Sequence, residues 1–223
     1  MSTVLVVVAH PDDEVLGCGG VIARHTSQGD KVVLCCMTNG VSARENHHEE
    51  LLKRQLAQKS ASIELGLFDV INFNFPDNQL DSVPLLTIVK SIETVMSKYR
   101  PTIIYTHFSG DLNIDHSITN RAVLTASRPQ KGNTVNEIYS FEVLSSTEWY
   151  PNSSQIFSPQ MVVDITHVYE KKVRALNCYE LELRPFPHSR SYECIHALAT
   201  LRGATHGFKF AEAFMVERIL VNT

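Results

Sequence analysis

An apolar run that passes directly into an acidic turn, near the start of the chain, constrains the fold most. Residues 4–8, VLVVV, are all β-branched or leucine. Such a run is typical of a strand buried on both faces, as in parallel sheets. The turn after it contains His10, Asp12, Asp13 and Glu14. Ligands of open α/β sheets bind outside the carboxyl ends of the strands, so this turn predicts a functional site.

The rest of the chain alternates strand-like runs with helical patterns. Further strands are expected at 31–37, 69–75, 102–106, 137–143 and 162–164, with a last apolar segment at 210–221. Helices are expected from Asp12 or Asp13, as the cap, to 28, and at 45–65, 83–99, 115–126, 166–183 and 191–201. The helix over 45–65 is expected to carry its apolar face on Leu51, Leu52, Leu56, Ala57 and Ile63. This alternation predicts an α/β fold, with a parallel sheet and helices on both faces, in one domain over 1–223.

The composition excludes several classes of protein. Twenty basic and 24 acidic residues give a net charge of −4, which provides no field for nucleic acid or an anionic membrane. No apolar run approaches the roughly 18 residues of a membrane span, and the first ten residues do not resemble a signal peptide. Five cysteines without a C-x-x-C pair suggest neither a disulfide framework nor a cysteine zinc site. We therefore expect a soluble, cytoplasmic protein, and its oligomeric state stays open.

A second polar concentration follows the strand at 102–106 and ends at His116. The carboxyl ends of parallel strands share one edge of a sheet, so His10 and His116 can converge there. A single buried histidine is more often a satisfied core residue. Here, however, each histidine has carboxylates beside it, and two imidazoles plus one carboxylate around an open position form a hydrolytic zinc site. A further carboxylate can then serve as general base.

The glycines that follow the acidic turn offer a rival interpretation as a dinucleotide-binding loop. Gly17, Gly19 and Gly20 come well after the strand, however, and not in the turn itself. The acidic residue that the dinucleotide motif needs at the end of the second strand is also missing, because Asp30 precedes that strand. We expect these glycines to let the first helix pack closely against the sheet.

The motif AHPDDE at 9–14, with the following GCGG, resembles the opening signature of the LmbE/PIG-L family of zinc-dependent N-deacetylases. The similarity continues over nearly the whole chain, through TNG at 38–40, FPDN at 75–78, RP at 100–101 and 128–129, DLNIDH at 111–116, YE at 179–180, PHSRS at 187–191, RG at 202–203 and AEAF at 211–214. It implies a Rossmann-like, mainly parallel sheet. It also implies one divalent metal, usually zinc, and hydrolysis of an acetamide on an amino sugar or its conjugate.

The resemblance assigns roles residue by residue. His10, Asp13 and His116 match the metal ligands. Asp12 matches the general base, which takes a proton from the metal-bound water as it attacks the acetyl carbonyl and returns one to the leaving amine. Arg54 matches an arginine that contacts substrate, with a solvated helix charge as the alternative.

Two positions depart from the family pattern. Asn113 stands where several members have a histidine that assists the oxyanion or the leaving group. An amide can donate a hydrogen bond but cannot carry a proton at neutral pH, so acid catalysis would rest more on Asp12. Ala57 stands where many members have a glutamate, which predicts a different substrate pocket.

Other polar residues are candidates for supporting roles. His107, Asp115 and Glu14 are expected to orient the metal ligands or the helix that follows them. His188 and Arg190 could reach the cleft from the C-terminal loop and bind sugar hydroxyls or an anionic group. Trp149 lies in a Ser-, Asn- and Pro-rich loop at 145–158, a candidate lid, where it could stack on a sugar or simply pack.

The sequence thus predicts a metal-dependent hydrolase that removes an N-acetyl group from an amino sugar, sugar nucleotide or small glycoconjugate. Zn²⁺ or another divalent metal is the expected cofactor. The alternative is a non-catalytic nucleotide- or sugar-binding module, which would bind its ligand without releasing acetate.

Overall fold

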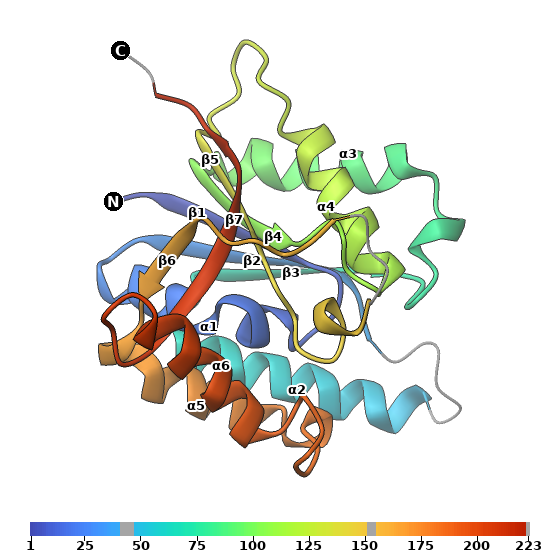
Figure 1. Ribbon diagram of the computed structural model, residues 1–223. Helices are drawn as coiled ribbons and strands as arrows, with labels where there is room; N and C mark the ends of the chain where they lie inside the picture. The colour runs from blue at the N-terminus through green and yellow to red at the C-terminus, as the bar shows by residue number, and fades with distance from the viewer. Residues whose placement is uncertain (41–46, 151–154, 222–223) are drawn as a thin grey trace.

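The strand-like runs form one mixed sheet in a computed structural model that describes residues 1–40, 47–150 and 155–221 (Figure 1). Its seven strands have the order β3-β2-β1-β4-β5-β7-β6. β1 pairs in parallel with β2 and β4, β2 with β3, and β4 with β5, whereas β7 is antiparallel to both β5 and β6. The expected mainly parallel α/β fold is confirmed. The strands are β1 (Thr3–Val8), β2 (Lys31–Thr38), β3 (Asp69–Phe75), β4 (Ile103–His107), β5 (Glu137–Phe141), β6 (Met161–Asp164) and β7 (Ala211–Ile219).

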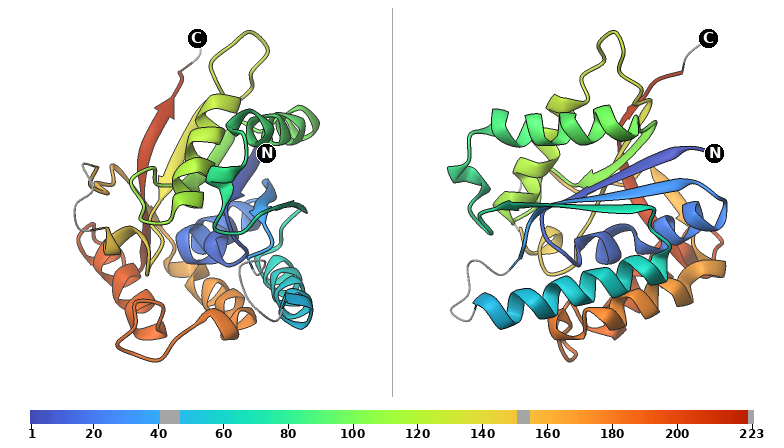
Figure 2. Two further views of the ribbon diagram at one scale, coloured as in Figure 1. Left: turned by 90° about the vertical axis from the view of Figure 1, so that its right-hand side faces the viewer. Right: turned by 180° about the vertical axis from the view of Figure 1, so that it is seen from behind.

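Helices cover both faces of this sheet (Figures 1 and 2). α1, α2, α5 and α6 pack against one face, and α3 and α4 against the other. The bounds are α1 (Asp13–Ser27), α2 (His47–Leu65), α3 (Leu85–Tyr99), α4 (Ile114–Ala126), α5 (Tyr169–Cys178) and α6 (Tyr192–Ala204). The short 3₁₀ helices are η1 (Leu80–Ser82), η2 (Thr147–Trp149), η3 (Thr166–Val168) and η4 (Glu180–Glu182).

The first strand, β1, contributes side chains to the hydrophobic cores on both faces of the sheet, as its sequence predicts. Val4, Val6 and Val8 belong to the core under α1, whereas Leu5 and Val7 belong to the core under α3 and α4. All five side chains are fully buried. Each contributes on the order of 1.5–3 kcal/mol by leaving water, so a charge at any of them would disrupt the sheet that positions the turn at His10.

The apolar face predicted for α2 is partly wrong. Leu52, Leu56 and Ile63 are 50%, 64% and 73% exposed, whereas Ala61 and Leu65 are buried. The inward face is instead shared with polar side chains that find partners there: Gln58 exchanges hydrogen bonds with Asn72 of β3, and Arg54 pairs with Glu182. Leucine periodicity alone therefore indicated the wrong side of this helix.

Several boundaries also differ from expectation. The helix predicted over 166–183 is divided into η3, α5 and η4, and the strand predicted over 137–143 ends at Phe141. Residues 45–46, where the second helix was expected to begin, and 151–154 of the candidate lid lie outside the described residues. Asp12 holds the N-cap position of α1, but its side chain makes no capping hydrogen bond.

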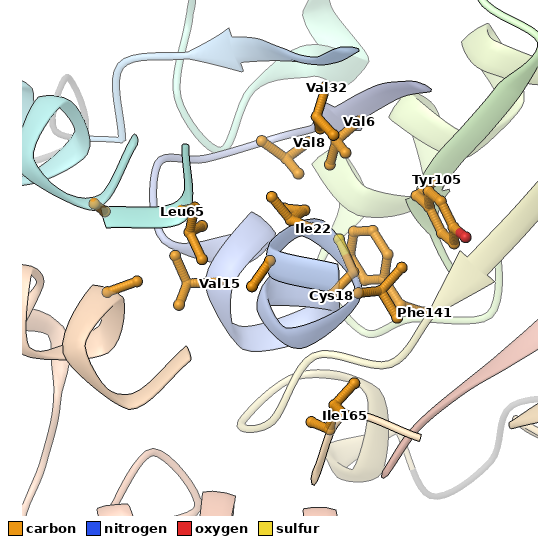
Figure 3. Packing of buried hydrophobic residues seen from close by; sticks show 14 of the residues in the cluster. Val6, Val8, Val15, Cys18, Ile22, Val32, Leu65, Tyr105, Phe141 and Ile165 are labelled. Atoms are coloured by element: carbon orange, nitrogen blue, oxygen red, sulfur yellow. The ribbon is translucent and has the colours of Figure 1, made fainter. Parts of the chain in front are cut away.

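The glycines of α1 pack against the sheet and its connections, as predicted. A Cβ on Gly17 would lie 2.1 Å from the ring of Phe141, and one on Gly20 would lie 2.7 Å from the side chain of Ile165. Figure 3 shows Phe141 and Ile165 beside this helix, whose Cys18 and Ile22 belong to the same core. The helix is not continuous, because Cys18 has non-helical dihedrals (φ −145°, ψ 23°).

Candidate metal centre

The polar turns converge where the strand order reverses. The chain runs outward from β1 through β2 to β3 and then returns to place β4 on the other side of β1. The turn at His10 and the segment around His116 follow β1 and β4, so they meet at the carboxyl edge of these two neighbours. Open α/β sheets bind ligands at such a switch point.

Three buried donor atoms face one another at this point. His10 Nδ1 lies 3.2 Å from Asp13 Oδ2, His116 Nε2 lies 3.3 Å from His10 Nδ1, and His116 Nε2 lies 3.4 Å from Asp13 Oδ2. Tetrahedral coordination with bonds of about 2.0–2.1 Å separates ligand atoms by about 3.3 Å. The three atoms thus fit a single divalent cation, and the residues expected to bind metal lie together.

The remaining ring nitrogens point at carboxylates. His10 Nε2 lies 3.2 Å from Asp115 Oδ2 and 3.2 Å from Asp77 Oδ1, and His116 Nδ1 lies 3.2 Å from Asp111 Oδ1. The facing carboxylates favour a proton on each of these nitrogens, which would leave the other nitrogen of each ring unprotonated toward the cluster. Metal-binding histidines are commonly oriented in this way.

A second possible donor set shares His10 with Asp77 and Asp115. It is less suited to a cation, because both oxygens of Asp115 already accept backbone hydrogen bonds, from Asn78 N at 2.7 Å and Leu80 N at 2.9 Å. Asp13 accepts one only through Oδ2, from His10 N at 2.8 Å. Using His10 Nε2 as a ligand would also remove the proton that it shares with these carboxylates. The set with Asp13 and His116 is therefore the better ligand set.

The electrostatics of the cluster favour positive charge. Burial lowers the pKa of His116, but Asp13 and Asp111 outweigh burial and raise the pKa to about 9. Burial would raise the pKa of Asp13, but His116 and the hydrogen bond with His10 hold it well below its usual range. A proton satisfies this field in the absence of metal, and a bound cation would replace that proton.

His107 supports the cluster without joining it. Its Nε2 accepts a hydrogen bond from Ala9 N at 2.9 Å, so the ring proton is on Nδ1. Burial and the neighbouring His116 lower the pKa of His107 to about 4, so the ring is neutral. Its Nε2 is 3.4 Å from Asp13 Oδ2, but both atoms are acceptors and form no ion pair. The ring stacks on His116, with centroids 3.8 Å apart, and fixes its plane.

Asp12 lies beside the cluster in a strained backbone conformation (φ 111°). Its Oδ2 accepts from Arg190 Nη1 at 2.9 Å and lies 3.7 Å from Arg54 Nη2. Its Oδ1 is buried and has no hydrogen-bond partner among the described residues. Burial raises the pKa of Asp12 above its usual value, although Arg190 and Arg54 oppose this.

Glu14 stabilises that turn instead of facing the cluster. Its Oε2 accepts from Asp12 N at 3.0 Å, and its Oε1 accepts from the Tyr179 hydroxyl at 2.7 Å. Burial raises the pKa of Glu14 to about 7. The residue holds the strained backbone of Asp12 and ties it to the end of α5.

The three residues expected to contact substrate are divided between two places. Both arginines converge on Asp12. Arg54 is 7% exposed and also pairs with Glu182, and Arg190 also donates to Ser145 Oγ at 2.7 Å. His188 instead packs edge-on against Trp149, with ring centroids 5.4 Å apart. A cavity of about 450 Å³ lies beside Arg54 and is also lined by Lys53, Ala57, Asn177, Tyr179 and Glu182.

Asn113 caps α4 and does not point freely into the site. Its Oδ1 accepts from Asp115 N at 2.9 Å, and its Nδ2 donates to Asn78 Oδ1 at 3.2 Å. These bonds join the loop after β4 to the turn after β3. They account for an asparagine at this position whether or not it also assists the reaction.

Sequence reasoning missed Asp111, Asp77 and Glu182. Asp111 is the most connected of them: it faces His116 and accepts hydrogen bonds from Asn113 N at 2.8 Å, Thr147 Oγ1 at 2.6 Å and the Ser146 hydroxyl. Asp77 and Asp111 both lie in loops that follow parallel strands. The rule that pointed to His10 and His116 would therefore have included them. Glu182 gave no comparable signal.

Comparison with known proteins places this chain in a family. The profile of the PIG-L family, described as GlcNAc-PI de-N-acetylase, matches residues 5–127. A probable N-acetyl-alpha-D-glucosaminyl L-malate deacetylase 2 of Bacillus cereus is 27% identical over 186 residues, which cover 79% of this chain and 81% of that protein.

Solved structures share the fold. N,N'-diacetylchitobiose deacetylase of Pyrococcus horikoshii aligns with a TM-score of 0.78 at 21% identity, over 97% of this chain and 84% of that one. GalB of Pseudomonas putida, a 4-carboxy-2-hydroxymuconate hydratase, aligns with a TM-score of 0.77 at 22% identity, over 100% and 99%. Because a hydratase and a deacetylase share it, the fold alone does not decide the reaction.

Among the described residues no helix is long and apolar enough to cross a membrane.

The family resemblance seen in the sequence is confirmed over more than half of the chain: the protein belongs to the PIG-L family.

Proposed function

We propose that this chain is a divalent-metal-dependent N-deacetylase that acts on an N-acetylated amino sugar or a small conjugate of one. Membership of the family supports the reaction class, and the name of the Bacillus cereus relative supports an N-acetylglucosaminyl substrate. The observation that carries the proposal is that a three-atom cation site lies beside the carboxylate of Asp12. The Oδ1 atom of Asp12 is buried and has no hydrogen-bond partner among the described residues.

His10, Asp13 and His116 would hold the cation, with Asp111 and Asp115 fixing the two imidazoles. When bound, the cation supplies Lewis-acid chemistry: it lowers the pKa of a water and polarises the acetyl carbonyl. Zinc suits two imidazoles and one carboxylate, and other divalent ions can use the same donors.

Asp12 would move the proton. Arg190 holds its Oδ2, which would leave Oδ1 available to the reacting groups. Oδ1 would take a proton from the attacking water and deliver it to the departing sugar nitrogen. The raised pKa of Asp12 suits the first step, because a very acidic carboxyl would take up the proton poorly. Asn113 cannot carry a proton, so no second acid is assigned.

Substrate would approach past Arg190, His188 and Trp149. Arg190 is partly exposed while it holds Asp12, and Trp149 remains 47% exposed although it contacts His188 edge-on. An exposed indole can stack on the apolar face of a sugar ring. The cavity beside Arg54 provides room for a substituent on the sugar.

Acetate release from a panel of N-acetyl amino sugars, free and conjugated, tests the proposal. The wild-type protein should release acetate from at least one of them. Asp12→Asn should retain the cation and lose about 10²–10⁴-fold in kcat, whereas His116→Ala should lose the cation itself. A fully active Asp12→Asn protein would refute the assigned base. Ligand binding without acetate release, insensitive to a chelator, would favour the non-catalytic binding module.

A further inference from the structure

The break in α1 lies one turn after the residues of the proposed metal site. Asp13 and Glu14 begin this helix, and Cys18 interrupts it. In a continuous helix Gly20 N would donate to Leu16 O, four residues earlier. At the break, both atoms bond to side chains from other elements.

A buried ion pair supplies those bonds. Lys172 Nζ of α5 donates to Leu16 O at 3.0 Å, and Glu212 of β7 accepts from Gly20 N at 2.8 Å through Oε1 and from Val21 N at 2.7 Å through Oε2. The two side chains are joined at 2.6 Å, and both residues are 5% exposed or less. The ammonium group of Lys172 therefore meets the carbonyl end of the first helical turns. The carboxylate of Glu212 meets the N–H end of the following segment. This polarity matches both helix ends.

We propose that Lys172 and Glu212 are positioning residues, which set the first turns of α1 and through them the placement of Asp13 in the cation site and of Asp12 beside it. The inference rests on the proposed metal site and names residues that do not touch it. Asp13 and Leu16 are three residues apart in one helical segment, so a shift of the Leu16 carbonyl toward Gly20 would move Asp13 with it.

A simpler role would be to hold α5 and β7 together. A buried ion pair is seldom a net source of stability, because the loss of hydration offsets the attraction. Replacing such a pair with apolar residues of similar size is often tolerated. The two roles thus differ: a mere tie between α5 and β7 can be replaced by apolar contact, whereas the backbone groups at the break need polar partners.

The test is a double variant, Lys172→Met with Glu212→Leu, which removes both charges at once. Two quantities are measured at a temperature where circular dichroism shows the protein folded: the affinity for added Zn²⁺ and the hydrogen exchange of the Gly20 and Val21 amides without metal. We expect affinity to fall about 10–100-fold, as for other residues that orient ligands, and both amides to exchange at least about tenfold faster. Lys172→Arg keeps the polarity and should retain most of the affinity.

Arg174 and Glu64 provide a control on the same helix as Lys172. They form another ion pair, at 2.6 Å, between α5 and α2, away from the break in α1. Arg174→Met with Glu64→Leu should leave both quantities unchanged. Wild-type affinity and exchange in the Lys172/Glu212 variant would overturn the positioning role alone. Failure of the wild-type protein to bind Zn²⁺ would overturn the metal site and this inference together.

Discussion

Asp12 and Asp13 are neighbours in sequence, yet their surroundings drive their protonation in opposite directions. Burial would raise the pKa of each carboxyl. At Asp13 the neighbouring His116 and His10 reverse this effect and keep the carboxyl ionised, whereas at Asp12 two arginines offset burial only in part. Their assigned roles follow from this difference. An anionic ligand needs a low pKa, and a group that exchanges a proton needs a higher one.

The arginine beside the base gives a prediction about pH. Arg190 favours the ionised form of Asp12, so Arg190→Met should raise the pKa of Asp12 further. Because the ionised form is the active base, the acid limb of the kcat/KM profile should move to higher pH. Arg190→Lys should move it less. An acid limb that stays in place, or moves to lower pH, would show that Asp12 does not govern it.

The carboxylates behind the histidines give a prediction about metal affinity. Asp111→Asn should weaken cation binding about 10–100-fold, because the amide orients His116 less well and removes a charge. Asp81→Asn, an exposed acid on η1, is the control and should bind as the wild type does. Isothermal titration with Zn²⁺ measures both. Equal affinities for all three proteins would show that Asp111 does not orient His116 for the cation.

Trp149 gives a prediction about substrate binding. If its exposed indole stacks on the sugar, Trp149→Ala should raise KM several-fold and leave kcat nearly unchanged. Steady-state kinetics on the best substrate of the panel measures both constants. Unchanged KM would assign Trp149 to packing against His188.

At the scale of elements, α1 combines a prediction that was confirmed with a feature that was missed. Glycines at helical positions indicated close packing, and Gly17 and Gly20 show it. The break at Cys18 could not be predicted, because its partners Lys172 and Glu212 lie more than 150 residues away in sequence. The exposed leucines of α2 were misplaced for a similar reason. Arg54 and Gln58 turn inward only because Glu182 and Asn72 meet them.

The packing of Gly17 predicts a loss of stability. Its Cβ would lie 2.1 Å from the Phe141 ring, so Gly17→Ala should destabilise the fold by about 1–3 kcal/mol despite the better helix propensity of alanine. Phe141→Leu in the same protein should recover part of the loss, since it vacates the space. Chemical denaturation measures the free energy of unfolding. A Gly17→Ala protein as stable as the wild type would contradict the close packing.

At the scale of the whole molecule, one rule accounts for most of what the sequence revealed. Buried parallel strands end at one edge, so the polar turns that follow them share a site. This rule brought His10 and His116 together from 106 positions apart. It could not place Glu182 or Tyr179, because they belong to the C-terminal part of the chain, from the end of α5 onward.

The central claim is that a cation held by His10, Asp13 and His116 enables hydrolysis of an acetamide. The most direct measurement follows acetate release while metal-stripped protein is titrated with Zn²⁺ or another divalent ion. We predict that the stripped protein is inactive and that the rate rises in proportion to bound cation, up to one per chain. Full activity in the stripped protein would contradict the claim.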